Sequence, residues 1–202
     1  MLNSYIPGIT VSIPLENGVT AQVTVTQHAA LHQFTYAAGT DQLLLLLDLT
    51  TDLSRSYQGN GTVDISTANN GTRVTGKGRF LPSFGEGSYE VFFCYDSRAF
   101  EQAKFYHNNP TVNQITYTNI TQGFSSEIGQ QNPAGVLMTF SPESDGVLMV
   151  RMGVSWTSTE KACSYGEAEI PDLGAFDTIK TAARFADDTL LLYVPTLNTL
   201  RF

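Results

Sequence analysis

Residues 150–172 read Val150-Arg-Met-Gly-Val-Ser-Trp-Thr-Ser-Thr-Glu-Lys-Ala-Cys-Ser-Tyr-Gly-Glu-Ala-Glu-Ile-Pro-Asp172, and their pattern changes midway. The first part continues an apolar run over residues 147–154, which predicts a strand. Thr157-Ser-Thr-Glu160 then has the form of a capping box, so a short helix is predicted over Thr159 to Glu169. The chain therefore changes from strand to helix within about one turn of Trp156.

Downstream, Pro171-Asp172 ends this helix and begins another. Its predicted apolar face consists of Phe176, Ile179, Ala183 and Ala186.

Upstream, alternation of apolar and polar residues predicts strands. Residues 19–26 place Val19, Ala21, Val23 and Val25 on the face predicted to be buried. In residues 73–80 the polar residues share one face, and Gly76 and Gly78 indicate a bulge or a close backbone approach. Further strands are predicted at 9–13, 31–36, 42–49, 62–66, 89–96, 115–121 and 135–140.

Two segments give less regular patterns. The longest apolar run, Leu43 to Leu47, is too short to cross a bilayer, which needs about 20 residues. We expect it to be a strand buried on both faces. Residues 100–133 predict a long loop with a single strand at 115–121.

Many strands followed by helix indicate an all-β fold, an antiparallel β-sandwich with a short C-terminal helical segment. A length of 202 residues favours one large β-domain. We expect the sandwich to occupy residues 1–156 and a helical segment or linker to occupy residues 157–186. Residues 187–202 are expected to form a divergent tail.

The composition excludes some partners. Hydrophobic residues make up 42% of the chain, which is enough to bury a core. The net charge is −8 and the basic residues do not cluster, so neither nucleic acid nor an anionic membrane is expected to bind.

Three glycosylation sequons begin at Asn60, Asn70 and Asn119, and they favour a secreted protein. No signal peptide is visible after Met1, so we expect the true N-terminus to lie upstream. The two cysteines, Cys94 and Cys163, leave two alternatives open. They could pair, but two small buried hydrophobic side chains are the favoured interpretation.

The sequence gives little evidence for any catalytic or metal-binding group. His28, His32 and His107 lack a third ligand at metal spacing, so no metal site is expected. Carboxylate pairs can serve glycosidases as acid and base, although a solvated surface or capping role is favoured here. The candidate pairs are Asp48 with Asp52, Glu86 with Glu90, and Glu167 with Glu169, and Asp187-Asp188 is expected to be a helix-end or linker feature.

Trp156 is the sole tryptophan and follows the last predicted strand. Aromatic side chains stack on sugar rings, so contact with a sugar or a neighbouring domain is one hypothesis. A core position is the more common role of a lone tryptophan and is the favoured alternative.

Residues 150–172 resemble the end of the N-terminal domain of glycoside hydrolase family 92. In that family a strand of the form R-x-G-[IV]-S-F-[IV]-S leads into a helix containing E-x-A-x-x-N-x-E-x-E-[IL]-P. Trp156 stands where the family usually has Phe, and Gly166 stands at or near its Asn. After Arg184 the Trp-Asn pair that is usual in the family is absent. The resemblance to the family also includes residues 18–26, 32–34, 45–49 and 89–94.

This resemblance implies a galactose-mutarotase-like supersandwich from a secreted, calcium-dependent, inverting exo-α-mannosidase that trims N-glycans. In the family the sandwich packs on an (α/α)₆ catalytic barrel, which holds the acid, the base and the calcium. We therefore expect a truncated, inactive portion of such an enzyme, lacking its first strands, its catalytic domain and any cofactor. Mannose-containing glycans would bind through the complete enzyme, with the catalytic domain as an intramolecular partner. The alternative is a stand-alone carbohydrate-binding or adhesion module.

Overall fold

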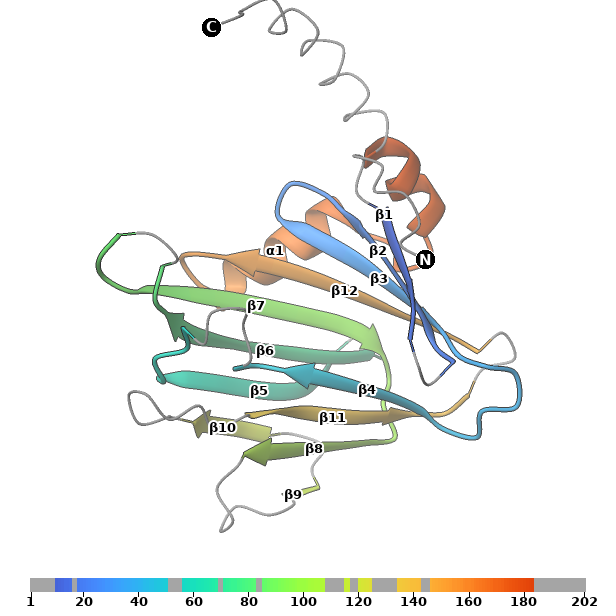
Figure 1. Cartoon of the computed structure of the whole chain (residues 1–202), viewed down its shortest axis with the longest axis horizontal. Coiled ribbons are helices and arrows are strands. Elements are labelled where there is room, and N and C mark those ends of the chain that lie inside the picture. The colour runs from blue at the N-terminus through green and yellow to red at the C-terminus, as the bar shows by residue number, and fades with distance from the viewer. Residues whose placement is uncertain are drawn as a thin grey trace, which may run out of the picture.

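A computed structural model of the chain describes residues 10–15, 18–50, 56–68, 71–82, 85–107, 115–116, 120–124, 134–142 and 146–183. These residues form two antiparallel sheets and a C-terminal helical segment (Figure 1). The all-β sandwich predicted from the sequence is therefore confirmed. The elements are β1 (Thr10–Pro14), β2 (Thr20–Val25), β3 (Ala29–Thr35), β4 (Leu43–Asp48), β5 (Gly61–Ala68), β6 (Gly71–Phe80), β7 (Tyr89–Arg98), β8 (Gln102–His107), β9 (Ile115–Thr116), β10 (Ile120–Phe124), β11 (Ala134–Phe140), β12 (Val147–Ser155) and α1 (Thr159–Glu169).

The larger sheet has the strand order β1-β2-β3-β12-β7-β6-β5-β10, and the smaller has β4-β11-β8-β9. Strands β6 and β7 pair along their full length, from Gly71 opposite Arg98 to Phe80 opposite Tyr89. Strand β12 lies between β3 and β7, so the last strand of the chain occupies the middle of the larger sheet. That position places the start of the following helix close to the centre of the sheet.

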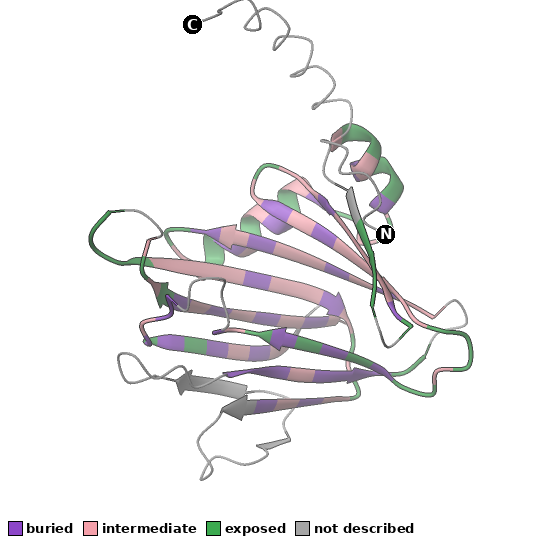
Figure 2. Cartoon of the chain, in the orientation of Figure 1, coloured by how far each residue is buried: buried purple, intermediate pink, exposed green. Residues whose placement is uncertain are grey.

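The main core lies between the sheets. We call the face of the larger sheet that meets the smaller sheet its inner face, and the opposite face its outer face. Val63, Ile65, Val74 and Val150 of the larger sheet pack there with buried residues of β4, β8 and β11. In Figure 2 strand β11 is buried along most of its length.

Helix α1 packs on the outer face, chiefly over β12 and β7. Ser158 is its N-cap and accepts a hydrogen bond from Lys161 N at 3.1 Å. The predicted helix bounds are confirmed, but the predicted capping box is wrong by one residue, because Ser158 and not Thr157 caps the helix. A second helical segment covers residues 176–183, as predicted. There Phe176 and Ile179 join a smaller core with Leu31 and Ile170.

The prediction that residues 43–47 are buried on both faces is wrong. Leu43, Leu45 and Leu47 point into the core, whereas Leu44 and Leu46 are 52% and 54% exposed. Strand β4 belongs to the smaller sheet, and Leu44 and Leu46 lie on the side of the strand that faces away from the core, so only alternate leucines are buried.

Two further predictions need correction. The stretch 100–133 contains strand β8, which pairs with β11, and not only one strand near 115–121. In β2 the fully buried side chain is Thr24, while Val23 and Val25 are half-buried. Thr24 pairs with Leu31, which faces the helices, so in this part of the sheet the helical side is the buried one.

The predicted close approach at Gly76 and Gly78 is confirmed, and the pairing of β6 continues through both residues without a bulge. A Cβ at Gly76 would collide with the carbonyl oxygen of Thr62 and lie 2.7 Å from the Phe93 ring. A Cβ at Gly78 would lie 2.9 Å from the Phe80 ring. Glycine therefore makes room for aromatic side chains on the inner face.

Candidate functional site

Trp156 follows β12 at a tight turn, where the residue is 70% exposed. The turn is held by Ser155, whose Oγ accepts a hydrogen bond from Thr157 N at 3.1 Å and lies 2.9 Å from Thr157 Oγ1. These bonds orient the backbone on both sides of the indole. The core position favoured for a lone tryptophan is therefore wrong.

Trp156 is the exposed end of a row of aromatic rings. Its ring centroid lies 5.3 Å from that of Tyr89 in an edge-on arrangement, and Tyr89 lies 6.1 Å from Phe80. Phe80 in turn contacts Tyr57 edge-on at 5.6 Å. We call these four residues the aromatic row. It runs from the exposed indole to Tyr57, which is 3% exposed and belongs to the main core.

The row is anchored in the core at one end and open to solvent at the other. Tyr89 is 37% exposed, so two adjacent aromatic side chains face solvent. Such rings can stack on the CH face of a sugar or pack against an apolar surface. Burial raises the pKa of Tyr57 to about 12, so this phenol is neutral and serves as a packing group.

The sequence identified Trp156 but missed Tyr89 and Phe80. They come from two other strands and are brought beside Trp156 only by the order of strands in the larger sheet. The sequence does place an aromatic residue, Tyr89, at the start of a predicted strand and after a glycine-rich turn. Exposed aromatic residues are common, however, and nothing in the sequence indicated that Tyr89 lies beside Trp156.

Among the candidate carboxylates, Glu86 is exposed, whereas Asp48, Glu90, Glu167 and Glu169 accept hydrogen bonds from other groups. Glu90 accepts hydrogen bonds from Lys77 Nζ and Asn60 Nδ2, both at 2.9 Å, and Glu167 is paired with Arg73 Nη2 at 2.6 Å. Asp48 accepts from Thr50 N at 3.0 Å. Asp52, Asp187 and Asp188 lie outside the described residues.

Glu169 binds the turn between β2 and β3. Its carboxylate accepts from Thr26 Oγ1 at 2.6 Å and His28 N at 2.8 Å, and lies 2.7 Å from His28 Nδ1. The His28 ring also stacks on Tyr165 with centroids 4.0 Å apart. Partial burial opposes ionisation of Glu169, but the hydrogen bonds from Thr26 and His28 outweigh it and hold the pKa of this carboxyl below its usual range.

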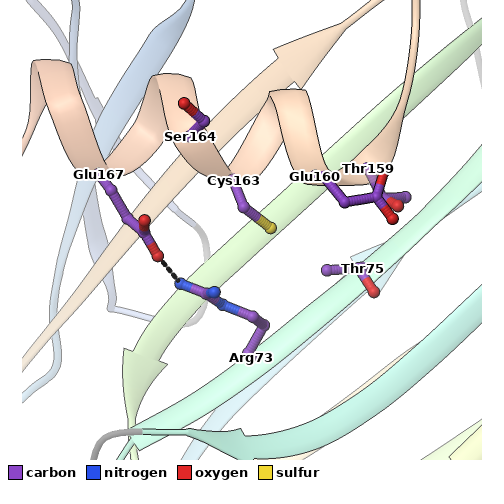
Figure 3. A pocket seen from close by; sticks show the side chains of 7 residues that line it. All are labelled: Arg73, Thr75, Thr159, Glu160, Cys163, Ser164 and Glu167. Carbon is purple, nitrogen blue, oxygen red and sulfur yellow. Dashed lines mark hydrogen bonds and ion pairs between the residues drawn. The ribbon is translucent and has the colours of Figure 1, made fainter.

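A shallow groove of about 370 Å³ runs between α1 and β6 (Figure 3). It is lined by Arg73, Thr75, Thr159, Glu160, Cys163, Ser164 and Glu167. Figure 3 shows the Arg73 guanidinium directed at Glu167 across the groove. The groove therefore contains an ion pair and hydroxyl groups.

Arg73 and Glu167, which line the groove, belong to a charged cluster with Asp96 and Arg151. Asp96 accepts from Arg73 Nε at 2.7 Å and from Arg151 Nε at 3.1 Å. Arg151 Nη1 also donates to the carbonyl of Ile170 at 2.6 Å, directly after α1. Burial opposes ionisation of Asp96, but the hydrogen bonds from Arg73 and Arg151 outweigh it and lower the pKa of Asp96.

A disulfide joins Cys94 of β7 to Cys163 of α1, with Cα atoms 5.0 Å apart. The favoured interpretation of two separate buried thiols is therefore wrong. Gly153 of β12 lies directly beneath α1, since a Cβ there would collide with the carbonyl oxygen of Ala162 and lie 3.0 Å from Gly166 N. Several residues of the 150–172 segment thus fasten the helix to the sheet, whereas Trp156 is a large apolar residue of the segment that is exposed.

Histidine provides no metal site in the described part of the chain, where no group of three or more His, Cys, Asp or Glu residues is suited to a metal. His32 lies between Phe34 and Tyr95, with ring centroids 6.2 Å and 6.4 Å away, and burial lowers its pKa. The side chain of His107 lies outside the described set.

Of the three sequons, Asn60 is described and exposed, whereas Asn70 and Asn119 lie outside the described residues. None of the described helices is long and apolar enough to span a membrane.

Comparison with known proteins gives consistent matches. Residues 11–155 match the Glycosyl hydrolase family 92 N-terminal domain. An uncharacterized secreted glycosidase of Arthroderma benhamiae is 33% identical over 184 residues, which cover 87% of this chain and 23% of the relative.

Solved structures share the fold. The family GH92 glycosyl hydrolase ccman5 superposes with a TM-score of 0.66 at 19% identity, covering 82% of this chain and 20% of that protein. The family GH92 inverting mannosidase BT2199 of Bacteroides thetaiotaomicron gives a TM-score of 0.61 at 14% identity, covering 87% and 21%. The chain thus spans between a fifth and a quarter of the length of these relatives.

Proposed function

Because the chain belongs to the family of glycosyl hydrolase family 92 N-terminal domains, we propose that it is the non-catalytic β-sandwich of a secreted glycosidase acting on mannosides. The family match carries this proposal. The inverting mannosidase among the structural neighbours supports mannosides as the substrate class. Hydrolysis itself, and the calcium that accompanies it, we assign to the catalytic domain of the complete enzyme.

The arrangement of carboxylates supports a non-catalytic role. Inverting glycosidases need an acid and a base carboxyl about 6.5–9.5 Å apart with water between them. Here Asp96, Glu90, Glu167 and Glu169 are each bound by cations or backbone donors that hold them in structural contacts. Such carboxylates lack the apolar environment that makes one of them a proton donor near neutral pH.

The aromatic row supports a role in contact with sugar or with the catalytic domain. Its open end presents Trp156 and Tyr89, and its closed end is fixed in the core. A platform that is anchored in this way holds its rings in place before a partner arrives, which lowers the entropic cost of binding. We place the contact between this sandwich and the rest of the enzyme, or its glycan, at this end of the larger sheet.

Secretion is supported by the disulfide and by the sequons. Disulfides persist in oxidising compartments and are rare in the cytosol. The Cys94–Cys163 bond connects two elements 69 residues apart, and the Arthroderma relative is described as secreted.

The test is an activity assay of the purified chain with an aryl α-mannoside in the presence of calcium. We expect no turnover above a blank without protein, while a family 92 mannosidase in the same buffer serves as the positive control. Turnover that co-purifies with the chain would overturn the proposal.

The exposed aromatic pair favours one second candidate, a stand-alone carbohydrate-binding module. Since Trp156 is the sole tryptophan, its fluorescence reports on this end of the molecule alone. A saturable change in Trp156 fluorescence on titration with millimolar mannose would favour the module, provided that the change is lost in Tyr89→Ala. An unchanged spectrum would favour a surface that contacts another domain.

A further inference from the structure

Asn60 ends a tight turn between Tyr57, which forms an isolated bridge with Phe80, and the start of β5. Gly59 and Asn60 have φ angles of 84° and 57°, so two successive residues adopt the left-handed conformation. Asparagine is among the non-glycine residues that tolerate this region best. The turn therefore lifts the Asn60 side chain out of the sheet, where it is exposed.

The sequon Asn60-Gly-Thr62 continues directly from this turn into β5, and Thr62 is also exposed. The turn by itself would accept glycine or aspartate at position 60. It does not require a threonine two residues later. The structure thus makes both side chains of the sequon accessible at the surface.

The position of the amide is also defined. Asn60 Nδ2 donates to Glu90 Oε1 at 2.9 Å, and the same oxygen accepts from Lys77 Nζ. A primary amide nitrogen has two hydrogens. One can remain on Glu90 while the other is replaced, so substitution of Nδ2 is compatible with this contact.

Glu90 also fixes which face of the sheet the amide lies on. Successive residues of a strand point to opposite faces, so Glu90 lies on the outer face and Tyr89, which is part of the aromatic row, on the inner face. Asn60 therefore projects on the side of the larger sheet that carries α1, away from Trp156.

We propose that Asn60 is N-glycosylated and that its glycan extends over the outer face beside Lys77 and Glu90, leaving the aromatic row free. In this step Asn60 Nδ2 forms a bond to the anomeric carbon of an oligosaccharide carried on a lipid diphosphate. The lipid diphosphate leaves with the electron pair of the broken C–O bond, and the amide loses one proton. The inference rests on the secretion included in the proposed function.

The test is secretion of the full chain from yeast behind a host signal sequence. The Asn60 peptide is then analysed by mass spectrometry after enzymatic removal of N-glycans in heavy-oxygen water. We expect most molecules to be modified at Asn60, and the modification to be lost in Thr62→Ala. Thr62→Ser should retain it, since Ser completes the same sequon. Asn60→Gly removes the acceptor but keeps the left-handed backbone, which separates loss of the site from misfolding.

An unmodified Asn60 in the secreted protein, from cells that modify a control glycoprotein, would overturn the proposal. The host signal supplies secretion, so this result would leave the proposed role in a glycosidase untouched, and the mannoside assay tests that role alone. Acrylamide quenching of Trp156 tests the placement of the glycan. We expect the same quenching constant for the glycosylated wild type and for Asn60→Gly secreted from the same cells, and a clearly higher constant in Asn60→Gly would contradict an outer-face glycan.

Discussion

In residues 150–172, the turn at Trp156 and the parts of β12 and α1 on either side of it behave in opposite ways. In β12, Arg151 donates to the carbonyl of Ile170 and Gly153 lies directly beneath α1. In α1, Cys163 is bonded to the sheet through its disulfide. Between them, Trp156 points into solvent on the other side of the turn. The difference separates the residues that hold the domain together from the residues available to a partner.

The comparison also explains why a family motif need not mark a catalytic site. In residues 150–172 the arginine, the first glycine and the last glutamate act on Asp96, on the helix backbone and on the β2–β3 turn respectively. These are structural tasks that depend on close contact between helix and sheet.

The largest effect is expected at Gly153. Gly153→Ala would force α1 away from β12, because the added Cβ overlaps the backbone of Ala162, and we expect a loss of about 4 kcal/mol or more in the free energy of unfolding. The measurement is urea unfolding followed by circular dichroism. Gly166→Ala is the matched control. Its Cβ would meet Arg151 at an ordinary 3.6 Å, and helix propensity predicts a gain of about 0.5–1 kcal/mol. Equal free energies of unfolding for the two variants would contradict the packing described for α1.

The disulfide is expected to be next in size. Cys94→Ala combined with Cys163→Ala removes a link across 69 residues, which predicts a loss of about 2–4 kcal/mol. Chemical denaturation of the variant under non-reducing conditions measures it. Reduction of the wild-type protein should give the same midpoint as the double variant, and a variant as stable as the oxidised protein would show that the bond does not hold the helix.

Acid should weaken the helix side of the molecule specifically. The pKa values of Asp96 and Glu169 lie below their ordinary values of 3.8 and 4.5, because hydrogen-bond donors stabilise both carboxylates. Their contribution is therefore fully present above those ordinary values and is lost as the pH falls through the lowered ones. Unfolding midpoints measured from about pH 7 to about pH 3 should fall at the acid end, and Glu169→Gln should flatten the decline. A decline of the same steepness in that variant would show that Glu169 is not involved.

The smallest effect on stability is expected on the exposed side. Trp156→Ala removes one edge-on contact with Tyr89, so the unfolding free energy should change by less than about 1 kcal/mol. Thermal unfolding measures this change. Trp156→Phe, which carries the residue usual in the family, should match the wild type. A loss of several kcal/mol in the alanine variant would place Trp156 among the residues that hold the fold.

Local patterns predicted much of this fold. The alternation in residues 73–80 gives β6, and the bounds of α1 follow from the capping residues before it and from the proline after it. The segment 150–172 also identified the family by its residue types. These features depend on neighbours within a few positions of each other, and such neighbours are visible in sequence.

Other features depended on how distant segments meet. The exposure of Leu44 and Leu46 follows from the place of β4 in the smaller sheet, and the pairing of β8 with β11 joins segments about 30 residues apart. The bond between Cys94 and Cys163, the contact of Glu169 with His28 and the aromatic row all join residues far apart in the chain. No local periodicity encodes such contacts, because the order of the strands determines them.

The sequence by itself determined that this is a β-sandwich with a helical end, related to family 92, with Trp156 and Asn60 as residues of interest. Only the tertiary structure decided that Trp156 stands outside the core beside Tyr89, and that Asn60 lies on the opposite face of the same sheet. The physical reason is that a strand assigns its residues to alternate faces, but only packing decides which face is covered.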